Sequence, residues 1–167
     1  MASMNMFIFN KLTKELINKC RARNYKLAVA ESCTGGLISS AITSVPGSSD
    51  IFECSFITYS NQSKKKFLNV SENNLNLFGA VSKEVVIDMI KGLKKNTNSD
   101  ILLAISGIAG PGGATINKPE GLVWISYGLE NDVVKTSKLE FGAIGRDLVR
   151  EKSTLQSLKL LISLFKD

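Results

Sequence analysis

A serine in a glycine-rich turn and a lysine in a later polar segment are the side chains of this sequence best suited to chemistry. Ser32 follows the apolar run KLAVA and precedes a pair of glycines. Lys64 comes shortly after Tyr59, where we expect the first turn of a helix. A partly desolvated lysine has a lowered pKa and can take the proton of a serine hydroxyl, while Tyr59 would orient the amine or relay a proton. Two plainer interpretations stay open: Ser32 caps a helix, and Lys64 is one of three solvated lysines.

The absence of histidine from the sequence narrows this chemistry. Without histidine there is no Ser-His-Asp triad, Cys-His dyad or histidine-ligated metal, so a general base must be Lys, Tyr, Asp or Glu. Cys33 is a second candidate nucleophile, which ranks below Ser32 because no histidine lowers the pKa of its thiol. The three cysteines, which include Cys20 and Cys54, form no CxxC pair. This pattern is typical of a reducing cytoplasm, and we expect neither a metal nor a cofactor.

Two glycine-bearing segments are expected at the carboxyl ends of strands, where α/β sheets bind ligands. The first, ESCTGG, leads into a predicted helix whose unpaired N–H groups and dipole favour an anion or a developing oxyanion. The second runs from Ser106 to Gly113 and is followed by Lys118 to Gly121. Its glycines allow a ligand to approach the backbone closely, and it lacks the Gly-Lys-Ser/Thr ending of a P-loop. The alternative for this second segment is a flexible connection.

A pair of arginines opens the last predicted helix. Arg146 and Arg150 are one helical turn apart and therefore lie on one face. Guanidinium groups match the oxygen atoms of phosphate and carboxylate groups, so the pair is a candidate anion site. In the alternative interpretation the helix is simply exposed, and Asp147 and Glu151 are the partners of the two arginines.

The periodicity of apolar residues predicts helices and strands in alternation. An order of α-β-α-β-α-β-β-β-α favours a mixed sheet between two layers of helices. We therefore predict a single α/β domain over residues 1–167, built as a three-layer α/β/α sandwich. The expected helices are 7–23, 37–43, 83–96 and 145–165; the expected strands are 26–30, 53–59, 101–105, 121–128 and 133–141; and 69–79 reads as a turn region.

The composition restricts the partners of this chain. A net charge of +6 over 167 residues fits either a solvated basic surface or attraction of an anionic small molecule. Nucleic-acid binding is less well supported, because the basic clusters contain no interleaved aromatic residues. No stretch reaches the roughly 18 consecutive apolar residues of a membrane span, and the first ten residues lack the features of a signal peptide. We expect a cytoplasmic protein with no membrane or nucleic-acid partner.

Several short motifs, taken together and in order, carry a family resemblance. They are AESCTGG, YSN-x-x-K, FGAVS, GIAGPGG, KP-x-G-x-VWI and G-x-R-x-x-VR. This series resembles the C-terminal domain of the CinA competence/damage-inducible family over about residues 11–164. Stand-alone members of that family include nicotinamide-nucleotide amidohydrolases. The resemblance implies hydrolysis of the carboxamide of nicotinamide mononucleotide to nicotinate mononucleotide and ammonia, a salvage step in pyridine nucleotide metabolism.

The resemblance also implies roles for individual residues. Ser32 would be the nucleophile and Lys64 the base, with Tyr59 beside them, while Arg146 would hold the 5′-phosphate. The residues expected to contact the substrate are Glu31, Cys33, Thr34, Gly35, Gly36, Asn61, Gly107, Gly110, Gly112, Gly113 and Arg146.

Departures from the family pattern concern the walls of the pocket. Ser106 stands where threonine is expected, and Leu122 replaces a small or hydroxyl residue. The stretch 114–117 is less glycine-rich and less acidic than expected. Two other hypotheses compete with the enzyme: a non-catalytic nucleotide-binding or regulatory module, and a DNA-binding protein whose affinity falls steeply with salt. The implied partners are an anionic nucleotide substrate and further copies of the chain in a homo-oligomer.

Overall fold

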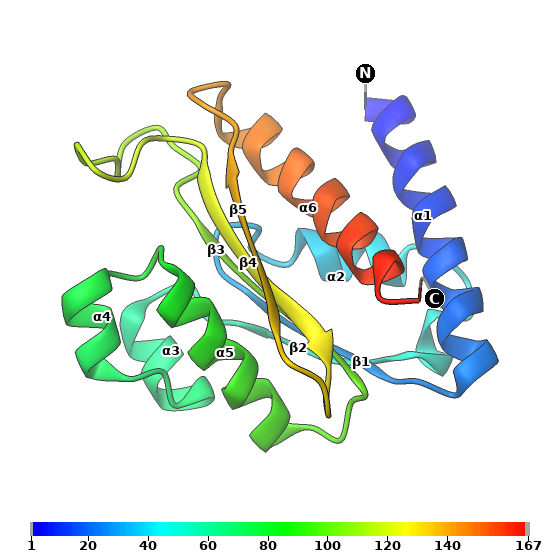
Figure 1. The fold of residues 1–167 in the computed structure, drawn as a ribbon. Helices are drawn as coiled ribbons and strands as arrows, with labels where there is room; N and C mark the ends of the chain where they lie inside the picture. The colour runs from blue at the N-terminus through cyan, green and yellow to red at the C-terminus, as the bar shows by residue number, and fades with distance from the viewer. Residues whose placement is uncertain (1, 166–167) are drawn as a thin grey trace.

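A twisted five-stranded sheet runs through the centre of the computed structural model, which describes residues 2–165 (Figure 1). The strand order is β2-β1-β3-β4-β5. The first three strands of the chain pair in parallel, β4 is antiparallel to β3, and β5 is antiparallel to β4. The sheet is therefore mixed, as the sequence predicts. The strands are β1 (Leu27–Glu31), β2 (Phe52–Ile57), β3 (Ile101–Gly107), β4 (Leu122–Leu129) and β5 (Lys135–Glu140).

Two layers of helices enclose the sheet. Helices α1, α2 and α6 cover one face, and α3, α4 and α5 cover the other (Figure 1). The predicted α/β/α sandwich is confirmed by this arrangement. The helices are α1 (Ala2–Arg23), α2 (Leu37–Thr43), α3 (Asn61–Leu68), α4 (Glu72–Phe78), α5 (Lys83–Asn96) and α6 (Arg146–Ser163), with a short 3-10 turn at Ser48–Asp50.

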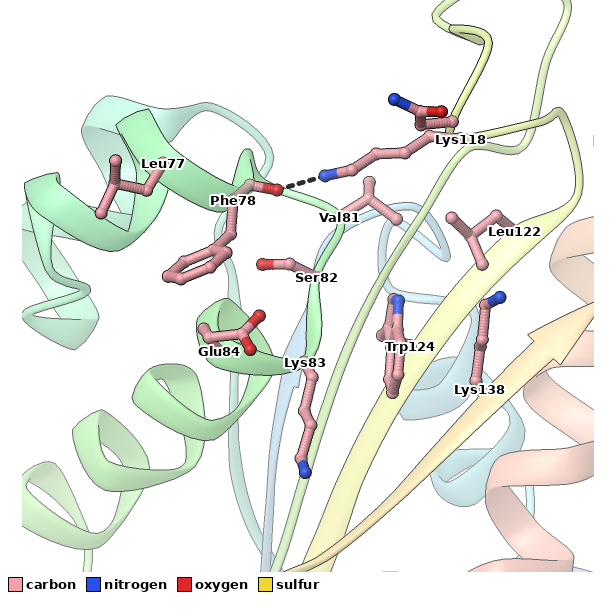
Figure 2. Close-up of a pocket in the computed structure, with 11 residues that line it drawn as sticks. Leu77, Phe78, Val81, Ser82, Lys83, Glu84, Lys118, Leu122, Trp124 and Lys138 are labelled. Atoms are coloured by element: carbon pink, nitrogen blue, oxygen red, sulfur yellow. Dashed lines mark hydrogen bonds between the residues drawn. The ribbon is translucent and has the colours of Figure 1, made fainter.

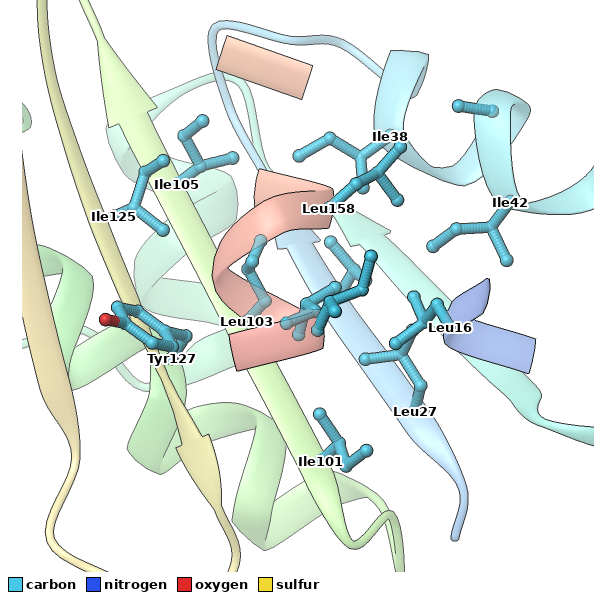
Figure 3. Close-up of a cluster of buried hydrophobic side chains, with 14 of the residues drawn as sticks. Leu16, Leu27, Ile38, Ile42, Ile101, Leu103, Ile105, Ile125, Tyr127 and Leu158 are labelled. Carbon is cyan, nitrogen blue, oxygen red and sulfur yellow. The ribbon is translucent and has the colours of Figure 1, made fainter. Parts of the chain in front are cut away.

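The central strands are apolar on both faces because both faces are covered. In β1, Leu27 and Val29 join the core under α1, α2 and α6, whereas Ala28 and Ala30 join the core under α5. Strand β3 alternates in the same way. Figure 3 shows the first of these cores, which contains Leu103 of β3 and Leu158 of α6. Burial on both sides explains why these strands read as continuous apolar runs.

The prediction of a turn region over residues 69–79 is wrong, because most of it forms helix α4. The segment is rich in asparagine, which has a low helix propensity. Its stability comes from contacts outside the segment. The Ser71 side chain caps the first turn, and the Asp88 carboxylate of α5 accepts hydrogen bonds from the Ser71 N–H and the Asn74 side chain. Leu75 is buried against the second core.

The parallel pairing of β2, β1 and β3 brings their carboxyl ends to one edge of the sheet. Ser32 follows β1, Tyr59 follows β2, and Gly107 ends β3. The three segments that the sequence predicts to carry chemistry therefore meet at this edge of the sheet.

Candidate active site

The centre of the site is a hydrogen-bonded pair of side chains from β1–α2 and α3. The Lys64 Nζ lies 2.9 Å from the Ser32 Oγ. It also donates a 2.7 Å hydrogen bond to the carbonyl oxygen of Thr58. A nucleophile and a base within hydrogen-bond reach, with the base held by a third group, is the arrangement that activates a serine.

Burial makes Lys64 able to act as a base. Its side chain is 1% exposed, and it is one of the largest fully buried side chains of the described residues. Loss of hydration disfavours the ammonium form and lowers the pKa of Lys64 from 10.5 to about 8. A substantial fraction of the amine is therefore neutral near physiological pH. The interpretation of Lys64 as a solvated surface lysine is wrong.

Local sequence explains how Lys64 is directed inward. Ser60 caps helix α3 by accepting from the Ser63 N–H, and the Ser63 hydroxyl accepts in return from the Ser60 N–H. This reciprocal cap fixes the start of the helix. Lys64 then lies on the inner face, whereas Lys66 is exposed on the outer face. The predicted helical position of Lys64 is confirmed.

A second set of contacts joins Arg146 to the two sides of the site. The guanidinium group donates 2.8 Å and 3.0 Å hydrogen bonds to the Tyr59 hydroxyl and the Gly110 carbonyl oxygen. Tyr59 is 60% exposed and lies at the rim of the site. Among the described residues, the Lys64 amine is hydrogen bonded to Ser32 and Thr58 and not to Tyr59. Tyr59 therefore positions Arg146 more directly than it positions the base.

These residues line a pocket of about 210 Å³. Its walls come from the turn after β1, the start of α3, the segment before α5, the end of β3 and the start of α6. Both a potential nucleophile and a guanidinium group face the same small space, which suits a ligand that carries an electrophilic carbon and an anion. The lining residues are Ser32, Cys33, Tyr59, Lys64, Ala80, Val81, Ser106, Gly107, Ala109 and Arg146.

Cys33 also lines the pocket, but its thiol is poorly suited to be the nucleophile. Burial raises the pKa of Cys33 to about 12, so almost no thiolate forms at neutral pH. The side chain packs closely instead: a Cβ atom at Gly107 would lie 3.0 Å from the Cys33 Sγ. Gly107 is thus needed for this close approach. The ranking of Ser32 above Cys33 is supported by the environment of each group.

Several N–H groups at the start of α2, where the sequence predicts an anionic ligand, donate hydrogen bonds to the Glu31 side chain. The Glu31 carboxylate accepts hydrogen bonds from the N–H groups of Gly36, Ile38 and Ser39, and a 2.5 Å bond from the Ser39 hydroxyl. Glu31 is fully buried and does not line the pocket. It acts as the anion that stabilises this helix terminus. The contact of Glu31 with substrate stays a prediction from the sequence.

Other residues expected to contact substrate lie around the pocket without lining it. The Thr34 carbonyl accepts a 2.9 Å hydrogen bond from Arg150, which holds the turn that carries Ser32 against α6. Gly110 contributes through its carbonyl group to Arg146. The remaining expected residues in this class, all outside the pocket wall, are Gly35, Gly36, Asn61, Gly112 and Gly113.

Sequence reasoning missed several contributors whose side chains carry no chemistry. The backbone of Thr58 orients Lys64, and Ala80 and Val81 form part of the pocket wall. The Ser106 hydroxyl donates a 2.7 Å hydrogen bond to the Ala80 carbonyl oxygen, which joins this wall to β3. The motif FGAVS contains Ala80 and Val81. The family resemblance therefore included this segment, but it did not indicate that the segment forms a wall of the pocket.

The described part of the chain contains neither a candidate metal cluster nor a helix that could span a membrane. Within residues 2–165, no three His, Cys, Asp or Glu side chains cluster in a way that could hold a metal ion. None of the helices in that range combines the length and apolar character needed to cross a bilayer.

Comparison with known proteins places this geometry in a family. The model of the CinA C-terminal domain matches residues 9–165. The nicotinamide-nucleotide amidohydrolase PncC of Enterobacter agglomerans is 39% identical over 156 residues, which cover 93% of this chain and 94% of that protein. The CinA-like protein of Thermosipho melanesiensis is 43% identical, but the match covers 91% of this chain and only 38% of its relative.

Solved structures agree with this assignment. The crystal structure of the competence/damage-inducible protein CihA from Agrobacterium tumefaciens superimposes with a TM-score of 0.93 at 34% identity, over 95% of this chain and 96% of that one. Like the Thermosipho protein, several CinA-like relatives are much longer than the matched region, which covers 36% to 38% of their length. The chain belongs to the CinA C-terminal domain family.

Proposed function

We propose that this domain hydrolyses the carboxamide of nicotinamide mononucleotide to nicotinate mononucleotide and ammonia. The observation that carries the proposal is the buried hydrogen bond between Ser32 and Lys64, in a pocket that Arg146 also lines. The likeness to PncC over nearly the whole of both chains supports the choice of substrate.

The proposed reaction begins with proton transfer inside the pair. As the Ser32 Oγ attacks the amide carbon, neutral Lys64 takes the hydroxyl proton. Protonated Lys64 is then a cation beside the developing oxyanion, which it stabilises. Lys64 returns the proton to the amide nitrogen, the C–N bond breaks, and ammonia leaves an ester on Ser32.

Water completes the proposed reaction by the same route in reverse. Lys64 takes a proton from the attacking water as the hydroxyl oxygen bonds to the ester carbon. The bond to the Ser32 Oγ then breaks, and Lys64 returns the proton to that oxygen. The net change is amide plus water to carboxylic acid plus ammonia, so no oxidant, metal or cofactor is required.

Arg146 is proposed to bind the phosphate of the substrate. It lines the pocket, and it is already oriented by Tyr59 and by the Gly110 carbonyl. A guanidinium group held in this way loses little side-chain freedom when it binds an anion. Replacing Arg146 with Gln should therefore raise KM for nicotinamide mononucleotide more than it lowers kcat.

The direct test is product analysis. Purified protein is incubated with nicotinamide mononucleotide, and nicotinate mononucleotide and ammonia are measured separately. The proposal expects equal amounts of the two products, and much slower reaction of nicotinamide riboside, which lacks the phosphate. Binding of the mononucleotide without either product would instead favour a non-catalytic nucleotide-binding module. A cytoplasmic location and a homo-oligomeric state remain predictions from the sequence.

A further inference from the structure

A second cavity lies outside the catalytic pocket. It has a volume of about 420 Å³, twice that of the pocket around Ser32. It lies where α5 leaves part of β4 and β5 uncovered, between those strands and the end of α4 (Figure 2). A volume of this size falls within the range of small-molecule sites.

One wall of this cavity is aromatic and apolar. Trp124, the single tryptophan of the chain, is only partly buried and points toward α5 from β4. Phe78 lies across from it at the end of α4 and is 41% exposed (Figure 2). A partly exposed indole over an open cavity provides a flat surface for stacking of a planar ring.

The rest of the cavity is cationic. Lys83, Lys118 and Lys138 line it, whereas Glu84 is its one acidic lining residue. Lys138 pairs directly with Trp124 across β4 and β5, and it also forms an ion pair with Glu140. Lys118 hydrogen bonds to the Phe78 carbonyl oxygen and so holds the two sides together. Positive charge next to a flat apolar wall suits an anion attached to a planar ring.

The cavity and the catalytic pocket share a wall. Val81 lines both spaces, and its neighbour Ala80 lines the catalytic pocket. The Ala80 carbonyl is bonded to Ser106 of β3, so the shared segment is held in place from the sheet side. Two ligands can therefore lie on opposite sides of Val81 at the same time.

We propose that the cavity over Trp124 is a second binding site, which takes a nucleoside monophosphate while the catalytic pocket holds its own ligand. The base stacks on Trp124, and the phosphate lies near Lys138 and Lys118. Binding at this second site does not require turnover. Its test is therefore independent of the proposed amidohydrolase activity.

The fluorescence of Trp124 provides the test, because no other tryptophan contributes to the signal. Wild-type protein is titrated with AMP, with adenosine and with inorganic phosphate, and the same titrations are followed by calorimetry. The proposal expects saturable quenching by AMP, with weaker binding of adenosine and of phosphate alone. Lys138→Gln removes one phosphate contact and should weaken AMP binding about 10-fold.

Lys135→Gln is the matched control, because Lys135 is exposed on the same strand but does not line the cavity. It should bind AMP as the wild type does. The proposal is overturned by the absence of both quenching and heat, or by equal losses of AMP affinity in the two lysine variants.

Discussion

Turnover of nicotinamide mononucleotide should rise with pH through the pKa of Lys64, because only the neutral amine can accept the Ser32 proton. Burial lowers this pKa to about 8. The neutral fraction is then about one tenth at pH 7 and about one half at pH 8, so kcat/KM should rise about fivefold between them and level off above pH 9. Ammonia release is measured under second-order conditions from pH 6 to pH 10.

Two lysine variants show whether the profile belongs to this residue. Lys64→Met removes the base and should lower kcat by about 10³ or more. Lys66→Gln changes an exposed lysine on the same helix and should keep both the wild-type rate and the inflection. A rate that is constant over the whole pH range would contradict the role of Lys64 as the base. A rate that climbs about tenfold per pH unit up to pH 10 would contradict its lowered pKa, because that is the behaviour of a lysine with an ordinary pKa.

Three further predictions concern stability. Glu31→Gln should lower the free energy of unfolding in urea by about 3 kcal/mol, because the buried carboxylate accepts four hydrogen bonds at the start of α2; a loss under about 0.5 kcal/mol would contradict this role. Gly92→Ala should cost about 2 kcal/mol, since the new Cβ would lie 2.2 Å from the Leu68 carbonyl oxygen; an unchanged melting temperature would show that α3 and α5 separate easily. The pKa of Lys64 is lower in the folded than in the unfolded chain, so the unfolded chain binds more protons between about pH 8 and pH 10.5. Wild-type stability relative to Lys64→Met should therefore rise by about 3 kcal/mol as pH increases through that window, and a constant difference would contradict the lowered pKa.

The parts of the fold that the sequence predicts are those with strong local patterns. The apolar runs of β1 and β3 have no alternation, which indicated strands covered on both faces, and both cores bear this out. The helix predicted over residues 83–96 is confirmed as α5, and the Ser82 side chain caps it by accepting from the Val85 N–H. Helix α4 was missed because Asp88 stabilises it from a distant segment, and no local pattern reports such a contact.

In the site, too, the residue types could be predicted from the sequence, whereas the contacts made by the folded chain could not. Ser32 and Lys64 were identifiable as chemical groups, but their burial is a tertiary property that a run of three lysines conceals. The structural contacts of Glu31 could not be predicted for a similar reason. Its position next to Ser32 fits a ligand contact equally well in the sequence, and only the folded turn shows that its carboxylate is taken up by α2. The contact between Lys64 and the Thr58 carbonyl oxygen could not be predicted from the sequence, because every residue has a backbone carbonyl group.

The Ser32→Ala variant tests the central claim most directly, through paired measurements of turnover and of binding to nicotinamide mononucleotide. We expect ammonia release to be abolished while Kd stays within about threefold of the wild-type value, because the variant removes the nucleophile and leaves Arg146 in place. Turnover at a rate near that of the wild type would contradict the claim that Ser32 attacks the amide.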